Sequence, residues 1–210
     1  MTPANGRARP AVVKLGGSHA AGPHLRDWLA AIAAEAGPIV IVPGGGPFAD
    51  AVRQAQGPIG YGNRAAHVMA LMAMAQFGAA LASLNPRLEA AASRAAIRRL
   101  MKAGKVPVWS PESMARAAAL PESWELTSDS LAAWLAGALR ASRLVLIKHG
   151  RFDSAQASAR DLAASGIVDP LFPRYLKASG VRAFLAGPAD SARLAEGLRR
   201  PLFPEIVAGP

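Results

Sequence analysis

Short apolar runs rich in valine, isoleucine and leucine alternate along the chain with longer segments of helical spacing. The runs have the length and continuous apolar character of buried strands in a parallel sheet. They are AVVKL at 11–15, PIVIVP at 38–43, VPVW at 106–109, RLVLI at 143–147 and VRAFLA at 181–186. Between them apolar residues recur at helical spacing, as at Leu25, Leu29 and Ile32. This alternation predicts an α/β fold, a three-layer αβα sandwich in which helices cover both faces of a mainly parallel central sheet.

The longest helical pattern spans residues 64–84 and contains a cluster of apolar side chains. They are Met69, Leu71, Met72, Met74 and Phe77. A methionine-rich stripe is typical of a core or of a contact between subunits, and that is the interpretation we give it. Turn signals at Gly57-Pro58 and at Asn85-Pro86 predict loops before and after this helix.

The length and composition predict one domain. The chain has 210 residues, of which 51% are hydrophobic, enough for one core or for two closely joined lobes. With no linker or repeat, we expect a single domain over residues 1–210, divided into lobes near residue 140. No apolar run reaches the roughly 20 residues that span a bilayer, and the start, MTPANGRARP, lacks the apolar core of a secretory signal. We therefore expect a soluble, cytoplasmic protein without a membrane partner.

The charge and the cysteine content limit the kinds of site and partner that the protein can have. The absence of cysteine excludes disulfides, zinc-thiolate sites, iron-sulfur clusters and cysteine nucleophiles. The formal net charge of +10 comes mostly from arginines, and it is compatible with a nucleic acid or with a small anionic substrate. The arginines are dispersed and aromatic residues are sparse, so we expect no nucleic-acid partner.

A first glycine turn follows the strand at 11–15. In VVKLGGSHA the strand ends at Lys14 and runs directly into Gly16, Gly17 and Ser18. Two glycines let backbone N–H groups approach an anion, and the lysine offers a flexible positive charge for phosphate oxygens. The segment matches neither the P-loop nor the GxGxxG pattern. It is therefore either a phosphate-binding turn or a plain turn.

A second glycine turn follows the strand at 38–43. In IVIVPGGGPFADAVR the residues Gly44, Gly45 and Gly46 precede a helix. Three successive glycines cost conformational entropy, which is tolerated where a side chain would block a close approach. We expect the backbone to approach a ligand here, and the alternative is a loose turn.

A third segment, WELTSDSLAAWLAGALRASRLVLIKHG, combines a polar helix start with a buried strand. Thr127, Ser128 and Asp129 are candidates to cap a helix that begins near Ser130. Capping needs only one of them, and an acidic group near bound phosphates needs lysines or a metal to offset it. Lys148 lies at the end of the next strand, and the carboxyl edge of a parallel sheet is where ligands bind.

The ordered set KLGGS, VPGGGPFAD, GNRAAHVMALMAM and LTSDSLAAWLAGAL resembles the amino acid kinase family, over roughly residues 11–150. That family includes acetylglutamate, carbamate, aspartate, uridylate and isopentenyl phosphate kinases. Within it, VPGGGPFAD and WELTSDSLAAWLA are similar to the kinases of methanofuran-type cofactor synthesis, which phosphorylate (5-(aminomethyl)furan-3-yl)methyl phosphate to its diphosphate. The resemblance implies an ATP-dependent kinase with an acceptor and phosphate lobe at 1–140 and a shortened nucleotide lobe at 141–210.

The resemblance also implies roles for the motif residues. Lys14 would hold the transferring phosphoryl group, and Asp129 would orient Lys14 and Lys148, the latter on the leaving-phosphate side. Gly16, Gly17, Ser18 and Ser128 would contact the ATP phosphates, and Gly44, Gly45 and Gly46 would contact the acceptor. Mg²⁺ would arrive with ATP, because no carboxylate cluster would hold a metal without phosphates.

Further side chains are candidates for the acceptor phosphate. Arg64 and His67 share a helix face at i, i+3, and Arg53 follows the glycine triplet. The alternative for Arg64 and His67 is an exposed polar cap on a core helix. His19 and His149 lie beside the candidate phosphate turns, where a lone histidine is more commonly solvated.

Two segments depart from the family pattern. IKHGRFD stands where relatives commonly carry a segment like TDVDGVY, and GIVDPLFPRYLKASG replaces a later Gly-Gly-Met and lysine segment. Asp169 and Lys177 are therefore not assigned to the site, and the adenine pocket is left open.

Three functional readings follow from these motifs. The first is phosphorylation of a small phosphate monoester, whose ionised oxygen needs no general base. The second is a kinase for uridylate, isopentenyl phosphate or an amino acid carboxylate, and the third is a non-catalytic nucleotide-binding member of the fold. The apolar helix at 64–84 predicts a homo-oligomer, most simply a dimer, and the resemblance to the amino acid kinase family implies the same.

Overall fold

The computed structural model describes residues 9–152 and 156–209. The strands are β1 (Ala11–Leu15), β2 (Ile39–Pro43), β3 (Leu88–Ala91), β4 (Val106–Trp109), β5 (Arg143–Ile147), β6 (Gln156–Ser158), β7 (Ala183–Ala186) and β8 (Glu205–Val207). The α-helices are α1 (Leu25–Ala34), α2 (Gly46–Ile59), α3 (Asn63–Ser83), α4 (Arg94–Lys102), α5 (Glu112–Ala117), α6 (Ser128–Leu139), α7 (Ala159–Ala164), α8 (Phe172–Ser179) and α9 (Leu194–Gly197). Short 3₁₀ turns lie at η1 (Gly17–His19) and η2 (Asp190–Arg193).

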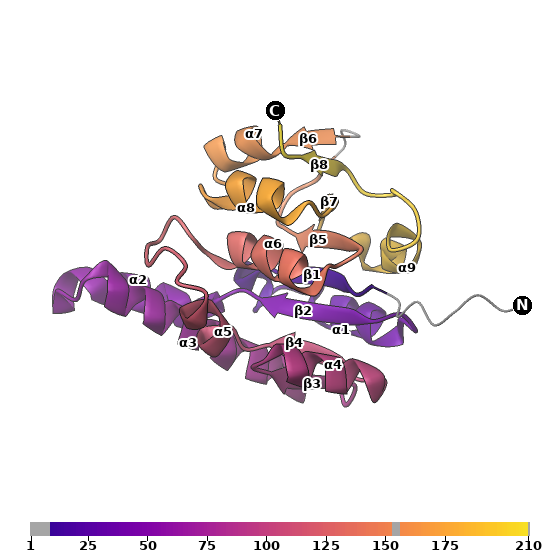
Figure 1. The fold of residues 1–210 in the computed structure, drawn as a ribbon, viewed down its shortest axis with the longest axis horizontal. Coiled ribbons are helices and arrows are strands. Elements are labelled where there is room, and N and C mark those ends of the chain that lie inside the picture. Colours follow the sequence, from indigo (N-terminus) through magenta and orange to yellow (C-terminus); the bar gives the residue numbers. More distant parts are fainter. Residues whose placement is uncertain (1–8, 153–155, 210) are drawn as a thin grey trace, which may run out of the picture.

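The described strands form an eight-stranded sheet in the order β3-β4-β2-β1-β5-β7-β8-β6. Its strand pairs are parallel except for β7 and β8, which run antiparallel. Helices lie on both faces of the sheet, with α6 and α8 on one face and α1 on the other (Figure 1). The predicted three-layer sandwich with a mainly parallel sheet is confirmed.

The apolar runs located the central strands but not the edges of the sheet. Each of the five predicted strands is present to within two residues of its predicted bounds. β3, β6 and β8 were not predicted, because they are only three or four residues long and expose side chains. The loop expected at Gly57-Pro58 is wrong: α2 continues to Ile59 and ends at Gly60, whose φ of 83° is left-handed. Pro58 therefore lies in the last turn of α2, where its missing N–H costs the helix one hydrogen bond to the preceding turn.

Alternation along β1 decides which face of the sheet each side chain joins. Val12 packs in the core beneath α6 and α8, while Val13 and Leu15 pack in the core beneath α1. Successive strand residues point to opposite faces, so Lys14 lies on the same side as Val12. This alternation directs the lysine towards α6.

Helix α3 divides its apolar side chains between the core and the surface. Leu71, Met74 and Phe77 are buried, whereas Met69 and Met72 are partly exposed. In the part of the chain that the structure describes, α3 is the one helix whose length and mean hydropathy of 1.5 would allow it to cross a bilayer, although the sequence analysis found no such run. Core helices satisfy the same criterion, and α3 packs on α2, β2, β3 and β4.

The two glycine turns are in direct contact with each other. β1 and β2 are parallel neighbours that pair Lys14 with Val42 and Leu15 with Pro43, so both turns leave the same edge of the sheet. A Cβ atom on Gly17 would overlap the backbone of Gly46, and one on Gly44 would overlap the backbone of Gly17. Three successive glycines were expected to let the backbone approach a ligand closely. In the structure, the close approach that they allow is to the backbone of the first glycine turn.

Asp169 fixes the start of α6 from a distant part of the chain. Its Oδ2 accepts hydrogen bonds from the backbone N–H groups of Thr127 and Ser130, both at 3.0 Å, and from the Thr127 hydroxyl at 2.8 Å. Its Oδ1 accepts a short hydrogen bond from the Ser130 hydroxyl. Thr127 makes no capping bond with its own side chain, so Asp169 supplies the cap that was expected from the local sequence. This arrangement leaves Asp129 free for another contact.

Replacing Gly17 by alanine should lower the free energy of unfolding by about 1–3 kcal/mol, because the added methyl group overlaps the second glycine turn. Gly37→Ala is the matched control, since a Cβ at Gly37 has no atom within 4 Å, and it should change stability by less than about 0.5 kcal/mol. Chemical denaturation of both variants measures the difference. Equal stabilities would contradict the contact between the turns.

Replacing Asp169 by alanine should lower the free energy of unfolding by about 1–3 kcal/mol, because buried donors at the start of α6 lose their acceptor. Asp161→Ala removes an exposed carboxylate from the first turn of α7 and should cost less than about 1 kcal/mol. Thermal and urea denaturation provide the measurement. A loss for Asp169→Ala no larger than that for Asp161→Ala would show that the cap is dispensable.

Candidate active site

The carboxyl edge of the sheet gathers the residues that the three sequence motifs predicted. Lys14 lies near the end of β1 and Lys148 directly follows β5, the strand that pairs with β1. Asp129 is the second residue of α6, which packs across β1 and β5. Residues from three separate segments therefore converge on one point at this edge.

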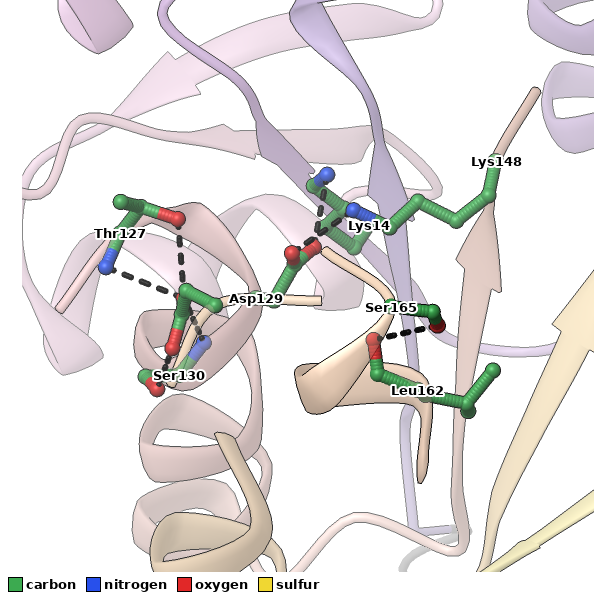
Figure 2. Close-up of polar contacts among 8 residues, drawn as sticks. Lys14, Thr127, Asp129, Ser130, Lys148, Leu162 and Ser165 are labelled. Carbon is green, nitrogen blue, oxygen red and sulfur yellow. Dashed lines mark hydrogen bonds and ion pairs between the residues drawn. The ribbon is translucent and has the colours of Figure 1, made fainter. Parts of the chain in front are cut away.

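Asp129 bridges the two lysines. Its Oδ1 lies 2.7 Å from Nζ of Lys14, and its Oδ2 lies 2.7 Å from Nζ of Lys148. Figure 2 shows the carboxylate between the two ammonium groups. Lys14 and Asp129 are each only 3% exposed, whereas Lys148 is partly open to solvent. The group carries two positive charges and one negative charge, which leaves a net positive charge for an anion.

Burial controls the ionisation of this group. It lowers the pKa of Lys14 from the usual 10.5 to about 8, against the attraction of Asp129. Burial alone would raise the pKa of Asp129, but Lys14 and Lys148 outweigh it and hold that pKa below its usual range. The carboxylate is therefore ionised at neutral pH, and Lys14 is still charged there.

A cavity of about 220 Å³ lies at the same edge of the sheet, lined by residues that follow Lys14 and precede Asp129 in the chain, although none of the three bridged residues lines it. The starts of α2 and α6 both border it, through Gly45, Gly46, Thr127 and Ser128. The first N–H groups of a helix have no partner within the helix and carry a partial positive charge. Asp169 takes those of Thr127 and Ser130 at the start of α6, but the start of α2 has no side-chain cap, so the α2 side of the cavity suits an anion. Its apolar wall is formed by Ala49, Ala70, Leu71, Met74, Leu126 and Leu131.

The first glycine turn and Ser128 border this same cavity. Gly17 and Ser18 line it together with Gly44 and Ser128. Gly17, Ser18 and Ser128 were assigned to ATP, and Gly44 to the acceptor, so the structure brings the two predicted sets together. Gly16 does not line the cavity.

Arg53 is held at the cavity by an aromatic side chain that the sequence analysis missed. Its guanidinium carbon lies 4.4 Å from the ring centroid of Trp124, within the range of a cation–π contact. The indole nitrogen of Trp124 donates a 2.7 Å hydrogen bond to Oε1 of Gln56. These contacts attach the loop before α6 to α2. Trp124 opens the WELTSDSLAAWLA motif quoted above, but the motif alone did not show that its ring lies over Arg53.

The predicted pair of Arg64 and His67 is separated. His67 lines the cavity and is buried, and burial lowers its pKa against the opposing effects of Glu122 and a hydrogen bond to the Ser123 backbone. The side chain of Arg64 is 85% exposed and lies 3.4 Å from Glu122. Arg64 therefore faces solvent at the start of α3 instead of entering the cavity with His67.

His19 and His149 stack beside the lysines. Their ring centroids are 4.2 Å apart and their planes differ by 8°. His19 is buried, and its Nε2 has no hydrogen-bond partner among the described residues. Burial first, and then the charges of His149 and Lys14, lower the pKa of His19 to about 4. The first glycine turn is thus packed against the segment that carries Lys148.

The two residues left unassigned have structural positions. Asp169 caps α6, and burial together with the nearby Asp129 charge raises its pKa against the hydrogen bonds from Ser130 and Thr127. Lys177 is exposed on α8. The sequence did not indicate Asp169 as a helix cap, because 39 residues separate it from Ser130.

Within residues 9–152 and 156–209, no group of three or more His, Asp or Glu side chains is placed to hold a metal ion. Both oxygens of Asp129 are engaged by lysines, so this carboxylate does not fit as a Mg²⁺ ligand. Asp153 of the IKHGRFD segment lies outside the described residues.

Solved structures of kinases share this fold. The chain superposes on a uridylate kinase from Archaeoglobus fulgidus with a TM-score of 0.70 and 16% identity, over 94% of this chain and 99% of that one. It superposes on a UMP kinase from Ureaplasma parvum with a TM-score of 0.69 and 15% identity, over 95% and 99% of the two chains. At these identities the likeness concerns the fold.

Sequence comparison identifies the family. The chain is 25% identical to a [5-(aminomethyl)furan-3-yl]methyl phosphate kinase from Methanocaldococcus jannaschii, over 93% of this chain and 97% of that protein. A sequence model of the amino acid kinase family matches residues 9–150, which is more than half of the chain and contains Lys14, both glycine turns, Asp129 and Lys148. The chain therefore belongs to the amino acid kinase family, as its ordered motifs predicted.

Proposed function

We propose that this chain is an ATP-dependent kinase that phosphorylates a small phosphate monoester to a diphosphate. The observation that carries the proposal is the bridged group of Lys14, Asp129 and Lys148 at the sheet edge that also holds a small cavity at two helix starts. Phosphoryl transfer needs positioning and compensation of the charge on the equatorial oxygens. Two lysines and the backbone N–H groups of the glycine turns supply both.

Each lysine has a distinct place in the proposed mechanism. Lys14, which is buried at the end of β1 just before the first glycine turn, donates hydrogen bonds to the transferring phosphoryl group. Lys148 is more exposed and stabilises the charge that develops on the leaving diphosphate. Asp129 holds both ammonium groups in place, so the enzyme need not reorganise them during the reaction. Mg²⁺ would be held by the phosphates of ATP and would offset part of their charge.

The cavity supports an acceptor with one small ring. About 220 Å³ is below the roughly 300–1,000 Å³ of cavities for drug-sized ligands, which favours a small monoester over a nucleotide. Arg53, His67 and the helix starts would hold the acceptor phosphate, and the apolar wall would contact the ring. Asp50 also lines the cavity, where its carboxylate lies 3.7 Å from the Arg53 guanidinium, and it would exchange this partner for the ammonium group of the acceptor. These features, with the relative from M. jannaschii, support (5-(aminomethyl)furan-3-yl)methyl phosphate as the acceptor.

The acceptor is tested by measuring ATP consumption and the ³¹P spectrum of the product with four substrates: the furan phosphate, uridylate, isopentenyl phosphate and aspartate. We expect a diphosphate product and the highest kcat/KM with the furan phosphate. Higher kcat/KM with uridylate would favour the second kinase reading. No turnover with any of the four would favour a nucleotide-binding protein without catalysis.

The homo-oligomer stays a prediction, and exposed apolar side chains support it. Ile59 is 72% exposed at the end of α2, and Met69 and Met72 are partly exposed on the neighbouring α3. Burying such side chains against a second copy would remove apolar surface from water. Light scattering of the purified protein measures the state.

Replacing Lys14 by alanine should lower kcat by at least about 100-fold, because a charged donor to the transferring group is lost. Lys177→Ala removes an exposed lysine from α8 and should leave kcat unchanged. Steady-state kinetics with ATP and the furan phosphate, alongside circular dichroism to verify folding, measure both. A folded Lys14→Ala variant with full activity would refute its role.

The reaction should slow in alkaline solution. Lys14 acts in its charged form, and its pKa in the free enzyme is about 8, so kcat/KM should fall as the pH rises through about 8. Bound phosphates favour the charged lysine, so kcat, which reports the bound complex, should fall only at higher pH. Rate measurements from pH 6 to 10 test this. If kcat/KM and kcat fell at the same pH, or if neither fell, the assignment of the pKa of about 8 to Lys14 in the free enzyme would be contradicted.

A further inference from the structure

A cavity of about 680 Å³ lies on the opposite edge of the sheet from the candidate active site. Pro10, Pro38 and Lys105, which each directly precede a strand, line it. The ends of α4 and α6 contribute Lys102 and Leu139. The cavity therefore lies at the amino edge, where strands begin and helices end.

The lining of this amino-edge cavity is strongly basic. It contains six basic side chains and no acidic one, and the six make no ion pair with any described residue. They are Arg9, Arg87, Arg98, Lys102, Lys105 and Arg140. Uncompensated positive charges gathered in one concave region repel one another and attract anions.

Backbone carbonyl groups account for three of these cations. Arg9 donates to the carbonyl oxygens of Arg140 at 2.7 Å and Ala141 at 2.9 Å. Arg87 donates to the Gly104 oxygen at 3.0 and 3.2 Å, and Lys105 donates to the Pro86 oxygen at 2.8 Å. Basic side chains commonly satisfy carbonyl groups at chain turns and helix ends, so these three have a structural role and fixed positions.

The other three cations have no such role. Arg98, Lys102 and Arg140 make no hydrogen bond or ion pair with their side chains in the described part of the chain, and all three are exposed. Arg98 and Lys102 are four residues apart on α4, where like charges destabilise a helix. Arg140 ends α6 with a left-handed φ of 51°, a position that favours glycine or asparagine. None of these three side chains therefore has a structural partner in the described part of the chain.

We propose that the amino-edge cavity binds a small ligand carrying two or more phosphate groups, either an inorganic oligophosphate or a nucleotide. Six cations exceed what one monovalent anion would neutralise, and arginine suits phosphate oxygens because of its forked donors. The volume lies within the range of cavities for small molecules. Met101, Leu139 and Pro38 give the cavity an apolar part, on which a nucleotide base can pack. The proposal is independent of the kinase activity.

Calorimetric titration of the full chain with inorganic tripolyphosphate, and separately with ATP, both without Mg²⁺, tests the proposal. The double variant Arg98→Ala, Lys102→Ala should bind tripolyphosphate at least about tenfold more weakly than the unchanged chain. The variant Arg140→Gly suits the left-handed backbone, keeps the fold, and should also bind more weakly. The double variant Arg26→Ala, Arg174→Ala removes the same charge from exposed sites elsewhere and should bind within about twofold of the unchanged chain.

Lys14→Ala separates the two anion sites and should retain tripolyphosphate binding at the amino-edge cavity. Weaker binding of both probes to Arg98→Ala, Lys102→Ala would show that the cavity recognises the phosphate chain, and weaker binding of ATP alone to that variant would add the base to the ligand. The proposal is overturned if neither probe binds, or if Arg98→Ala, Lys102→Ala binds as well as the unchanged chain. It is also overturned if the two double variants lose the same affinity, or if Lys14→Ala alone abolishes binding. No turnover is measured, so failure of the kinase proposal would not affect these outcomes.

Discussion

The contact of one buried carboxylate with two lysines determines how the rest of the site is built. Lys14 and Lys148 end neighbouring parallel strands, so their ammonium groups come close together at one edge of the sheet. Two like charges in such a buried place repel strongly, and Asp129 offsets this by accepting from both. This arrangement constrains the position of α6, because the start of the helix must place the Asp129 carboxylate between the two strand ends.

Other features of the fold meet that requirement. Asp169 supplies acceptors to the first N–H groups of α6, so that Asp129 need not cap its own helix. The two glycine turns contact each other without side chains, which brings the start of α2 next to the start of α6 around one small cavity. The stacked His19 and His149 rings then join the first turn to the segment after β5. The site is thus assembled from rigid ends of strands and helices.

The two edges of the sheet have different electrostatic characters. At the carboxyl edge Asp129 pairs with both lysines and offsets one of their two positive charges. At the amino edge six cations line a larger cavity, and the structure places no acidic side chain among them. β1 and α6 each reach from one edge to the other, since Arg9 precedes β1 and Arg140 follows α6. The turn after β1 and the start of α6 border the small cavity, and the opposite ends of these two elements border the larger one.

The sequence by itself determined the central strands, the two glycine turns and the family. It also indicated Lys14, Asp129 and Lys148, because strand ends and helix starts can be read from local patterns. Only the tertiary structure decided that Arg64 faces Glu122 while His67 enters the cavity, that Asp169 caps α6, and that Trp124 holds Arg53. It also gathered dispersed arginines into the amino-edge cavity. Periodicity fixes which face of an element a residue occupies, but contacts between residues far apart in the chain depend on strand order and helix packing, which local spacing does not encode.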